Sequence, residues 1–406
     1  MRILYLSRNY PNNVNSLLGI WVEGLVREVA RACEARVIAP VPYCPPLPES
    51  AEVAWFRKVA RRHHVNGVEV RSPRFLTGPG MSLHSIEGTT YYWGVAREVD
   101  RLRREFPFDL IHAHFIYPDG VSAVRLGRHY GVPVVITDHA TWKPWMDQYP
   151  RVRRQALEAL AGCDAHVSVS RWLQETVLAY AAPSEKFHVV PVGFDASIFD
   201  LPPPGAARKP AQILYVGRMH PTKGSDVLMH AMRSLIARRP QARLVMVGGS
   251  LGYRDFRLQE EKIRRLAHEL GLDAHVEFVG MKAHAEVARY IQESAVLVLP
   301  SRRESFGAVL VEALGCGIPV VATRCGGPQE IVTDTVGVLV PPEHPEALAA
   351  GLEQTLDRHR QYDPQSLRSY AVRNFSWQVI AEKHLALYGR VLSDAQRRDV
   401  GGVKGR

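Results

Sequence analysis

The stretch Val296–Cys316 constrains the fold more than any other part of this chain. It starts with the apolar run Val296–Leu299, which ends at Pro300, and a short apolar run bounded in this way is typical of a buried parallel strand. A loop and a second apolar run follow, and they predict a helix that is opened by Ser305 and Gly307. A parallel strand leading into a helix is the repeating unit of doubly wound α/β sheets, which bind ligands at the carboxyl ends of their strands.

Two carboxylates belong to this predicted unit. Glu304 lies in the loop and Glu312 lies two turns into the helix, with seven residues between them, so we expect both to face one crevice. Free peptide N–H groups at the start of the helix attract anions, while carboxylates accept hydrogen bonds from hydroxyl groups. The combination suits a sugar attached to a phosphate. The alternative is an ordinary strand and helix with two exposed glutamates.

Length and pattern predict two α/β domains. A chain of 406 residues exceeds one compact core, and 46% hydrophobic with 23% charged residues is typical of a soluble globular protein. The strand and helix pattern runs through residues 1–200, stops at the Pro-rich segment Leu201–Pro210 and restarts over 211–375. A last amphipathic helix, 376–392, lies beyond the second sheet and is free to cross back to the first domain, and we expect a disordered tail over Arg397–Arg406.

Composition also bears on location and partners. The apolar part of Met1–Arg8 is too short for a signal peptide, and no apolar run approaches the roughly 20 residues of a membrane span, so we expect a cytoplasmic protein. Five cysteines without paired spacing predict neither disulfides nor structural zinc. The net charge of +10 favours anionic partners: a nucleotide, an acidic lipid surface or nucleic acid.

The segment Ala51–His64 has the pattern of a basic amphipathic helix. Its apolar residues include the pair Trp55 and Phe56, and four cations flank that pair: Arg57, Lys58, Arg61 and Arg62. Such a helix could lie on the inner face of a membrane as a peripheral contact. The other interpretation is a solvated helix packed on its own domain.

Polar residues of the first domain follow its predicted strands. Gly19 stands between the loop after the first strand and the next helix. His114 ends the predicted strand 109–114, and Asp138 and His139 follow the predicted strand 133–137. Because parallel strands end at the same edge of a sheet, we expect the two histidines to lie near each other.

The loop after the first strand of the second domain carries two cations. Arg218 and Lys223 lie within Val216–Gly224, where a guanidinium fork and an ammonium group could both reach a diphosphate. The Gly-Lys-Ser/Thr order of a Walker loop is missing. No Asp-x-Asp occurs in the chain, so the carboxylate pair that commonly holds a divalent metal on a diphosphate is absent, and we expect no metal and no cofactor.

Taken together, these motifs resemble the signature of the retaining, nucleotide-sugar-dependent glycosyltransferases of family 4, which have the GT-B fold. The motifs that carry the resemblance are Val216-Gly217-Arg218 with Lys223-Gly224, Glu304 and Glu312 around Ser305-Phe306-Gly307, and Gly315–Val321 followed by Gly326-Gly327. Val190–Asp195 is similar to the family's Pro-Asn-Gly-Val-Asp element, with Val192 in place of the asparagine. Ile111–Phe115 with Tyr117–Gly120 resembles a branch that builds cell-surface polysaccharides.

The resemblance implies an α/β fold of two Rossmann-like domains facing across a cleft, with the acceptor on the first domain and the nucleotide sugar on the second. It implies catalytic roles for His114 against the sugar, for Glu304 on the sugar hydroxyls, and for Arg218 and Lys223 on the diphosphate. The remaining donor contacts would be Gly19 near the phosphates, backbone at Met281 and Lys282 on the base, Ser305, Phe306, Gly307 and Ala308 on sugar and phosphate, and Glu312 on the ribose. Asp138 and His139 would lie on the acceptor side.

The implied reaction is metal-independent hexosyl transfer with retention, from a UDP, GDP or ADP sugar to a glycan, a lipid-linked glycan or a small molecule. A GT-B-fold epimerase or phosphorylase would share the architecture; no cofactor lysine stands out for a phosphorylase, and the Glu304 and Glu312 element resembles the transferases more than an epimerase. A noncatalytic or nucleic-acid-binding basic protein is the alternative of another class. It is supported by net charge alone and has no aromatic and basic recognition motif, so we expect no nucleic-acid partner.

Overall fold

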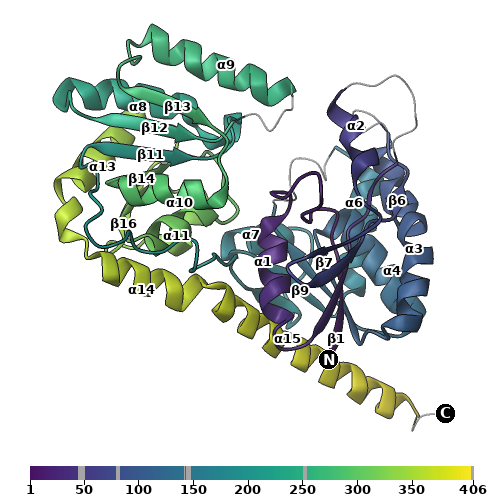
Figure 1. Ribbon diagram of the computed structural model, residues 1–406. Coiled ribbons are helices and arrows are strands. Elements are labelled where there is room, and N and C mark those ends of the chain that lie inside the picture. Colours follow the sequence, from purple (N-terminus) through teal and green to yellow (C-terminus); the bar gives the residue numbers. More distant parts are fainter. Residues whose placement is uncertain (44–50, 79–82, 141, 143–147, 250–253, 404–406) are drawn as a thin grey trace. The chain divides into compact units, whose positions relative to one another are not determined.

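A computed structural model describes residues 1–43, 51–78, 83–140, 142, 148–249 and 254–403. The chain divides into two compact units, each an α/β sheet with helices on it (Figure 1). The first unit comprises residues 1–193 and 380–406, and the second comprises residues 194–379. The two α/β domains predicted from the sequence are therefore present, and each has its own sheet.

The first unit contains an eight-stranded sheet in the order β10-β9-β8-β7-β1-β2-β5-β4. Its pairings are parallel except that β4 runs antiparallel to β5. The chain moves outward from β1 in both directions, so β1 and β7 flank the switch point of this sheet. The strands are β1 (Arg2–Leu6), β2 (Glu34–Ile38), β4 (Arg62–Val65), β5 (Val68–Arg71), β7 (Leu110–His114), β8 (Val134–Asp138), β9 (Ala165–Ser168) and β10 (Phe187–Val189), with β3 (Val41–Pro42) and β6 (Arg74–Phe75) as a separate pair.

Alternation along these strands assigns the side chains to two faces. Leu4, Leu6, Ile111 and Ala113 belong to the apolar core under α3, α4 and α6, so Tyr5, His112 and His114 lie on the opposite face. The last helix reaches that second face, because the hydroxyl of Tyr388 lies 2.6 Å from Nδ1 of His112. The helices and turns are α1 (Ile20–Val29), α2 (Ala51–Lys58), η2 (His84–Ile86), α3 (Glu87–Glu105), η3 (Ile116–Gly120), α4 (Val121–Tyr130), α6 (Pro150–Gly162), α7 (Arg171–Leu178) and α15 (Trp377–Val403).

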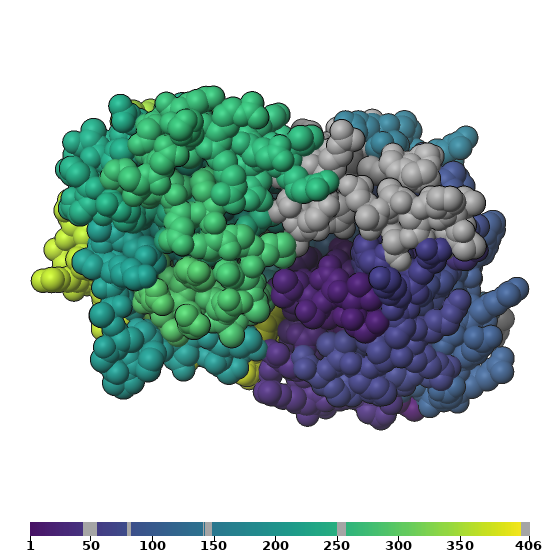
Figure 2. Space-filling view, turned by 45° about the horizontal axis from the view of Figure 1, so that its top comes forward, coloured from purple at the N-terminus to yellow at the C-terminus, as the bar shows by residue number. Residues whose placement is uncertain are grey.

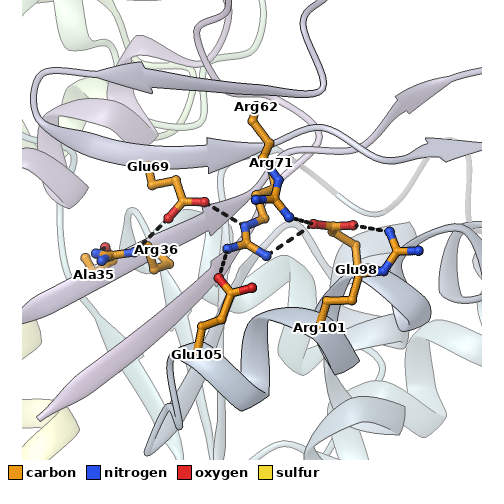
Figure 3. Close-up of polar contacts among 8 residues, drawn as sticks. All are labelled: Ala35, Arg36, Arg62, Glu69, Arg71, Glu98, Arg101 and Glu105. Carbon is orange, nitrogen blue, oxygen red and sulfur yellow. Dashed lines mark hydrogen bonds and ion pairs between the residues drawn. The ribbon is translucent and has the colours of Figure 1, made fainter.

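A buried arginine ties the edge of this sheet to α3. Arg71, at the end of β5, is 2% exposed, and its guanidinium contacts the carboxylates of Glu69, Glu98 and Glu105 at 2.7, 3.2 and 2.6 Å (Figure 3). Glu98 and Glu105 both belong to α3. An arginine can stay charged in such a place because its planar fork serves several carboxylates at once.

The second unit contains six parallel strands in the order β13-β12-β11-β14-β15-β16. The chain leaves β11 toward β13, then returns and continues from β14, so β11 and β14 flank the switch point. The strands are β11 (Gln212–Val216), β12 (Arg243–Val247), β13 (Val276–Gly280), β14 (Val296–Leu299), β15 (Val320–Thr323) and β16 (Gly337–Val340). The helices and turns are η4 (Pro221–Lys223), α8 (Ser225–Arg238), α9 (Arg254–Glu269), α10 (His284–Glu293), α11 (Ala308–Gly315), α12 (Pro328–Ile331), α13 (Pro345–Asp357), η5 (His359–Gln361) and α14 (Pro364–Phe375).

The boundary between the units lies before the segment predicted as a linker. Phe194 N–H donates to the carbonyl of Phe375 at 2.9 Å, and Arg368 donates to the carbonyl of Phe199 at 3.0 Å. Phe194 and Phe199 are also buried. Residues 194–200 therefore belong to the second unit, because tertiary hydrogen bonds anchor them there and local composition gives no sign of this.

Two other predictions are wrong. The expected helix over Ala51–His64 ends at Lys58, and Arg62 lies in β4, where it forms an ion pair with Glu98 at 3.5 Å. The expected disordered tail is helical through Val403, because α15 continues past residue 392. Arg398 in this last part forms an ion pair with Asp164 at 2.5 Å, a contact that sequence periodicity cannot predict.

Candidate active site

The two loops at the switch point of the second unit are held against each other by a glycine. Gly224, which follows η4, has φ +65°, and a Cβ added there would lie 2.0 Å from the carbonyl oxygen of Pro300. Only glycine permits this backbone approach. The loop after β11, which carries Arg218 and Lys223, is therefore fixed beside the loop after β14, which carries Glu304.

Lys223 and Glu304 form the central contact of this site. The ammonium Nζ lies 2.5 Å from Oε2 of Glu304, and the two side chains are 19% and 14% exposed. A second donor, the hydroxyl of Ser301, lies 3.3 Å from the same carboxylate oxygen. A cation and a carboxylate thus stand side by side at the carboxyl end of the sheet, one suited to phosphate oxygens and the other to hydroxyl groups.

The Glu304 loop is braced from several sides. Thr323 donates to the carbonyl of Ser301, and Gly327 N–H donates to the carbonyl of Glu304 at 2.9 Å. A Cβ added to Gly327 would lie 2.4 Å from Cα of Phe306, so the Gly326-Gly327 segment packs backbone to backbone on this loop. Arg302 binds Asp226 through two hydrogen bonds of 2.9 and 2.7 Å, which fix the loop to α8.

The helix after this loop begins as predicted. Gly307 caps α11 with φ 98°, and Ala308 is the first helical residue. Among the described residues, no acceptor is present for the N–H groups of Ala308 and Val309, as is normal for a first helical turn. Phe306 is buried with its ring centroid 5.8 Å from that of Phe375, so its peptide group and not its ring is left for a ligand; Ser305 is partly buried beside it.

Glu312 lies on the same helix and differs from Glu304 in having no charged partner. Among the described residues, no donor forms a hydrogen bond or ion pair with its carboxylate. Burial raises the pKa of this carboxyl group to about 7, because the charged form is poorly solvated. A half-buried carboxylate without a partner is well suited to accept hydrogen bonds from two neighbouring hydroxyl groups.

Arg218 is exposed in the loop after β11, and the hydroxyl of buried Tyr215 donates to its carbonyl at 3.0 Å. Its positive charge affects the titration of a neighbouring histidine. The pKa of His220 is lowered, first by burial and then by the charges of Arg218 and Lys223. Both cations therefore act on one small region of the loop, as binding a diphosphate requires.

Met281 and Lys282 directly follow β13. Met281 is 44% exposed, and its Cγ lies 3.7 Å from the position that a Cβ on Gly249 would take, while Lys282 pairs with Glu286 at 3.9 Å. The loops after β11 and β12 pack backbone to backbone, since a Cβ on Gly248 would lie 1.9 Å from the carbonyl oxygen of Gly217. Met281 thus stands at the same strand-end edge as the Arg218 loop.

In the first unit, Gly19 packs against the backbone of the loop that follows β1. It caps α1 with φ 64°, and a Cβ there would lie 2.0 Å from the carbonyl oxygen of Asn9. This N-terminal part of the chain, in purple, reaches the molecular surface (Figure 2). Gly19 therefore closes the loop that follows β1 at the switch point of the first sheet.

The two predicted histidines of the first unit are brought together. Nδ1 of His114 lies 2.9 Å from Nε2 of His139, and the rings stack at a centroid distance of 5.2 Å. Burial lowers the pKa of His114 well below its usual value and that of His139 to about 4. Both imidazoles are neutral at pH 7.

Asp138 is fully engaged by protein donors. Its carboxylate accepts from Ile116 N–H at 2.8 Å, from the indole of Trp142 at 2.6 Å and from His166 at 3.0 Å. Only 2% of the residue is exposed. These contacts fix the turn after β7, and with it the position of His114.

Sequence reasoning missed two groups near these sites. Ser301 supports Glu304, and its place directly after the strand was the only signal for it. Asp119 is buried at the switch point of the first sheet, where it accepts from Arg8 N–H at 2.7 Å and from Tyr91 at 2.6 Å. Burial raises the pKa of Asp119 to about 7; the residue lies in the Tyr117–Gly120 motif, but sequence reasoning assigned it no role of its own.

Solved structures define the class of this fold. The chain is similar to sucrose-phosphate synthase from Thermosynechococcus elongatus, with a TM-score of 0.77 and 22% identity over 97% of this chain and 100% of that one. It is also similar to Anabaena HepE, whose structure was determined in complex with UDP, with a TM-score of 0.73 and 19% identity over 96% and 100% of the two chains. The fold is that of the GT-B glycosyltransferases.

Sequence comparison establishes the family. Residues 19–198 match the model of Glycosyltransferase Family 4, and residues 199–372 match Glycosyl transferases group 1. The D-inositol 3-phosphate glycosyltransferase of Jonesia denitrificans is 32% identical over 80% of this chain and 82% of its own, and that of Paenarthrobacter aurescens is 30% identical over 78% and 82%. The chain belongs to the group 1 glycosyltransferases of family 4, as its motifs predicted.

Proposed function

We propose that this protein transfers a hexosyl group from a nucleoside diphosphate sugar to a hydroxyl acceptor, with retention of configuration and without a metal ion. The observation that carries the proposal is the Lys223–Glu304 pair beside the open N-terminus of α11. It offers a cation and peptide donors for the diphosphate next to a carboxylate for the sugar. A noncatalytic protein would have no need to maintain this combination.

In the proposed mechanism, the diphosphate leaves the sugar as its charge is taken up by Arg218, Lys223 and the N–H groups of α11. Glu304 holds sugar hydroxyl groups, and Glu312 holds the ribose. Among the described residues of the site no enzymic nucleophile is evident, so the sugar passes through an oxocarbenium-like state and is attacked from the face that the phosphate leaves. The departing phosphate accepts the proton of the acceptor hydroxyl.

The acceptor is proposed to be a small molecule, a glycan or a lipid-linked glycan. Two similar proteins bear names with phosphorylated small molecules in them, D-inositol 3-phosphate glycosyltransferase and sucrose-phosphate synthase. A panel of nucleotide sugars, each with inositol phosphates, sugar phosphates and extracted lipid-linked glycans, tests this proposal. Nucleotide release that depends on an acceptor supports transfer; conversion of the donor into its epimer, still joined to the nucleotide and without acceptor, supports an epimerase; no change in any donor contradicts both.

Donor turnover is expected to persist in excess EDTA. Arg218 and Lys223 can neutralise the diphosphate, and the described residues contain no cluster of three or more His, Cys, Asp or Glu that could hold a metal ion. The measurement is the initial rate with and without chelator. Loss of activity that Mg²⁺ or Mn²⁺ restores would contradict metal independence.

The affinity for the donor is expected to rise with pH because of Glu312. Its carboxyl group has a pKa of about 7, and ribose hydroxyls bind the ionised form better, so affinity is lost as pH falls below 7. We expect about a tenfold gain between pH 6 and pH 8 by calorimetry, since ionisation rises from about a tenth to nine-tenths. The diphosphate diester of a nucleotide sugar does not titrate in this range.

The variant Glu312→Gln separates this effect from other titrations. It should bind the donor more weakly and show no gain in affinity between pH 6 and pH 8. Protonation of His220, whose pKa is lowered, would instead raise the affinity for the anionic donor as the pH falls. His220 is still present in the variant, so any effect of its titration would persist there. A parent and variant with identical pH profiles would show that Glu312 does not bind the ribose.

A peripheral contact with an anionic membrane is proposed for the end of α2. Arg57, Lys58 and Arg61 are exposed there, beside the partly buried pair Trp55 and Phe56. Each cation near an anionic surface contributes about 1 kcal/mol, so three give weak, salt-sensitive docking. None of the described helices combines the length and the apolar character needed to cross a membrane.

Co-sedimentation with anionic vesicles at low salt measures this contact. Changing Arg57, Lys58 and Arg61 to glutamine should abolish binding. The matched control changes three exposed cations of the second unit, Lys262, Arg265 and Arg289, to glutamine and should leave most of the binding intact. Equal losses in the two triple variants would indicate attraction by net charge alone.

A further inference from the structure

We propose that His114 and His139 act as one unit, in which His139 is a positioning residue that sets which nitrogen of His114 carries its proton. The inference rests on the proposed function for its ligand, a substrate hydroxyl, but the pairing itself follows from geometry. His114 ends β7, and His139 follows the neighbouring strand β8. The two rings therefore meet at the strand-end edge of the first sheet.

The pair is held rigidly. The hydrogen bond joins Nδ1 of His114 to Nε2 of His139 at 2.9 Å, and the rings are inclined by 20°. Aromatic rings surround it: Tyr5 stacks on His114 at 6.1 Å, and Phe115 and Trp21 lie 5.3 and 6.2 Å from His139. Rotating either ring out of this arrangement would break the only hydrogen bond found for it among the described residues.

The bond couples the two tautomers. Each neutral imidazole carries one proton, and the bond needs one N–H and one lone pair. If Nδ1 of His114 is the donor, Nε2 of His139 is bare, so the proton of His139 is on its own Nδ1. If Nε2 of His139 is the donor, both protons are on Nε2. The two residues therefore carry their protons on the same-named nitrogen in either case.

The outer nitrogens of the pair are the atoms that remain for a ligand. Nε2 of His114 and Nδ1 of His139 are buried and have no partner among the described residues. In both arrangements one of them is a donor and the other an acceptor. A hydroxyl group can donate and accept, so it can bind His114 in either tautomer, whereas a phosphate can only accept and an ammonium group can only donate.

The neighbouring titratable groups do not compete for this bond. His112 is occupied by the hydroxyl of Tyr388 at 2.6 Å and by Thr137 at 2.8 Å, and Tyr388 in turn contacts Tyr5 at 3.2 Å. His384 on α15 donates from Nδ1 to the carbonyl of Ile380 at 2.9 Å, and the carboxylate of Asp138 is used by other donors. The His114–His139 pair is thus a separate two-membered network.

Long-range ¹H–¹⁵N NMR of the full chain labelled at histidine tests the coupling without any substrate. At pH 7.5 we expect His114 and His139 to show the same tautomer, both Nδ1–H or both Nε2–H. In His139→Leu the tautomer of His114 should change or become a mixture. In His139→Gln it should stay ordered, because the amide can replace Nε2 as donor or acceptor. Opposite tautomers on the two residues of the parent protein would overturn the proposal.

Kinetics test the positioning role. With the donor found by the nucleotide-sugar panel, kcat/KM should fall about tenfold or more in His139→Leu and recover to within about threefold in His139→Gln. His129→Gln, at an exposed histidine of α4, should match the parent. Unchanged kinetics in His139→Leu would overturn the positioning role. Matched tautomers in a protein that turns over no donor would contradict the proposed function while leaving the pairing intact.

Discussion

Replacing Lys223 with alanine is expected to lower kcat/KM for the nucleotide sugar by about 30- to 1,000-fold, which corresponds to about 2–4 kcal/mol of lost transition-state stabilisation. Lys223 contacts Glu304 at 2.5 Å in the half-buried site, so its charge is only partly screened by solvent. The variant also leaves Glu304 without its cation, next to a leaving group whose negative charge is growing. Steady-state kinetics with the identified donor give the measurement.

The matched control is Lys209→Ala. Lys209 also pairs with a glutamate of the second unit, Glu293 at 2.8 Å, but the two side chains are 61% and 40% exposed. Its loss should change kcat/KM by less than about twofold, as is usual for an exposed ion pair. Removing both charges, in Lys223→Met with Glu304→Gln, should cost less than the sum of the single variants because the two groups act together. Near-parental rates in Lys223→Ala would place the diphosphate elsewhere.

Replacing Arg71 with methionine is expected to lower the stability of the first unit by about 3 kcal/mol, the lower end of the range for breaking a buried ion pair. The Arg71 side chain is 3% exposed, and its guanidinium contacts three carboxylates. The loss of stability stays at the lower end because two of the carboxylates still have a cation in the variant. Glu69 pairs with Arg36 at 3.2 Å, and Glu98 pairs with Arg101 at 3.2 Å (Figure 3).

Hydrogen exchange of the β5 and α3 amides is the appropriate measurement, because a chain of two units need not unfold in one step. Arg71→Met should increase exchange in these elements far more than in the second unit. Arg101→Ala removes another cation from the same cluster, but that side chain is 65% exposed, so little change is expected. Equal effects of the two variants would contradict the role assigned to burial.

The part of the site that could be predicted from sequence is the part built by local pattern. Val296–Leu299 is β14, and Gly307 caps the helix that follows it, because a short apolar run, a proline and a glycine specify strand, loop and helix start within a few residues. The order of parallel strands then placed His114 and His139 at one edge, and the structure brings them into contact.

What sequence could not give depends on partners far along the chain. Arg71 is a charged residue in a buried place, and it needs the carboxylates of Glu98 and Glu105 on α3 as well as that of its neighbour Glu69. Arg62 was expected in a helix, but pairing with β5 and an ion pair to Glu98 place it in a strand. The boundary at residue 193 reflects the hydrogen bond from Phe194 N–H to the carbonyl of Phe375, two residues that no local window contains.

The return of the chain to the first unit has a consequence for its biosynthesis. Tyr388 and His384 of α15 are buried, and the Tyr388 hydroxyl contacts both His112 and Tyr5, yet residues 194–379 form the other unit. At about 5–20 residues per second, a ribosome needs roughly 10 to 40 s to add everything after residue 193. During that time His112 and Tyr5 lack their contacts with Tyr388 of α15. The first unit to emerge is therefore the last to be completed, and a nascent chain stalled anywhere before α15 presents an unfinished polar surface to the chaperones of the cell.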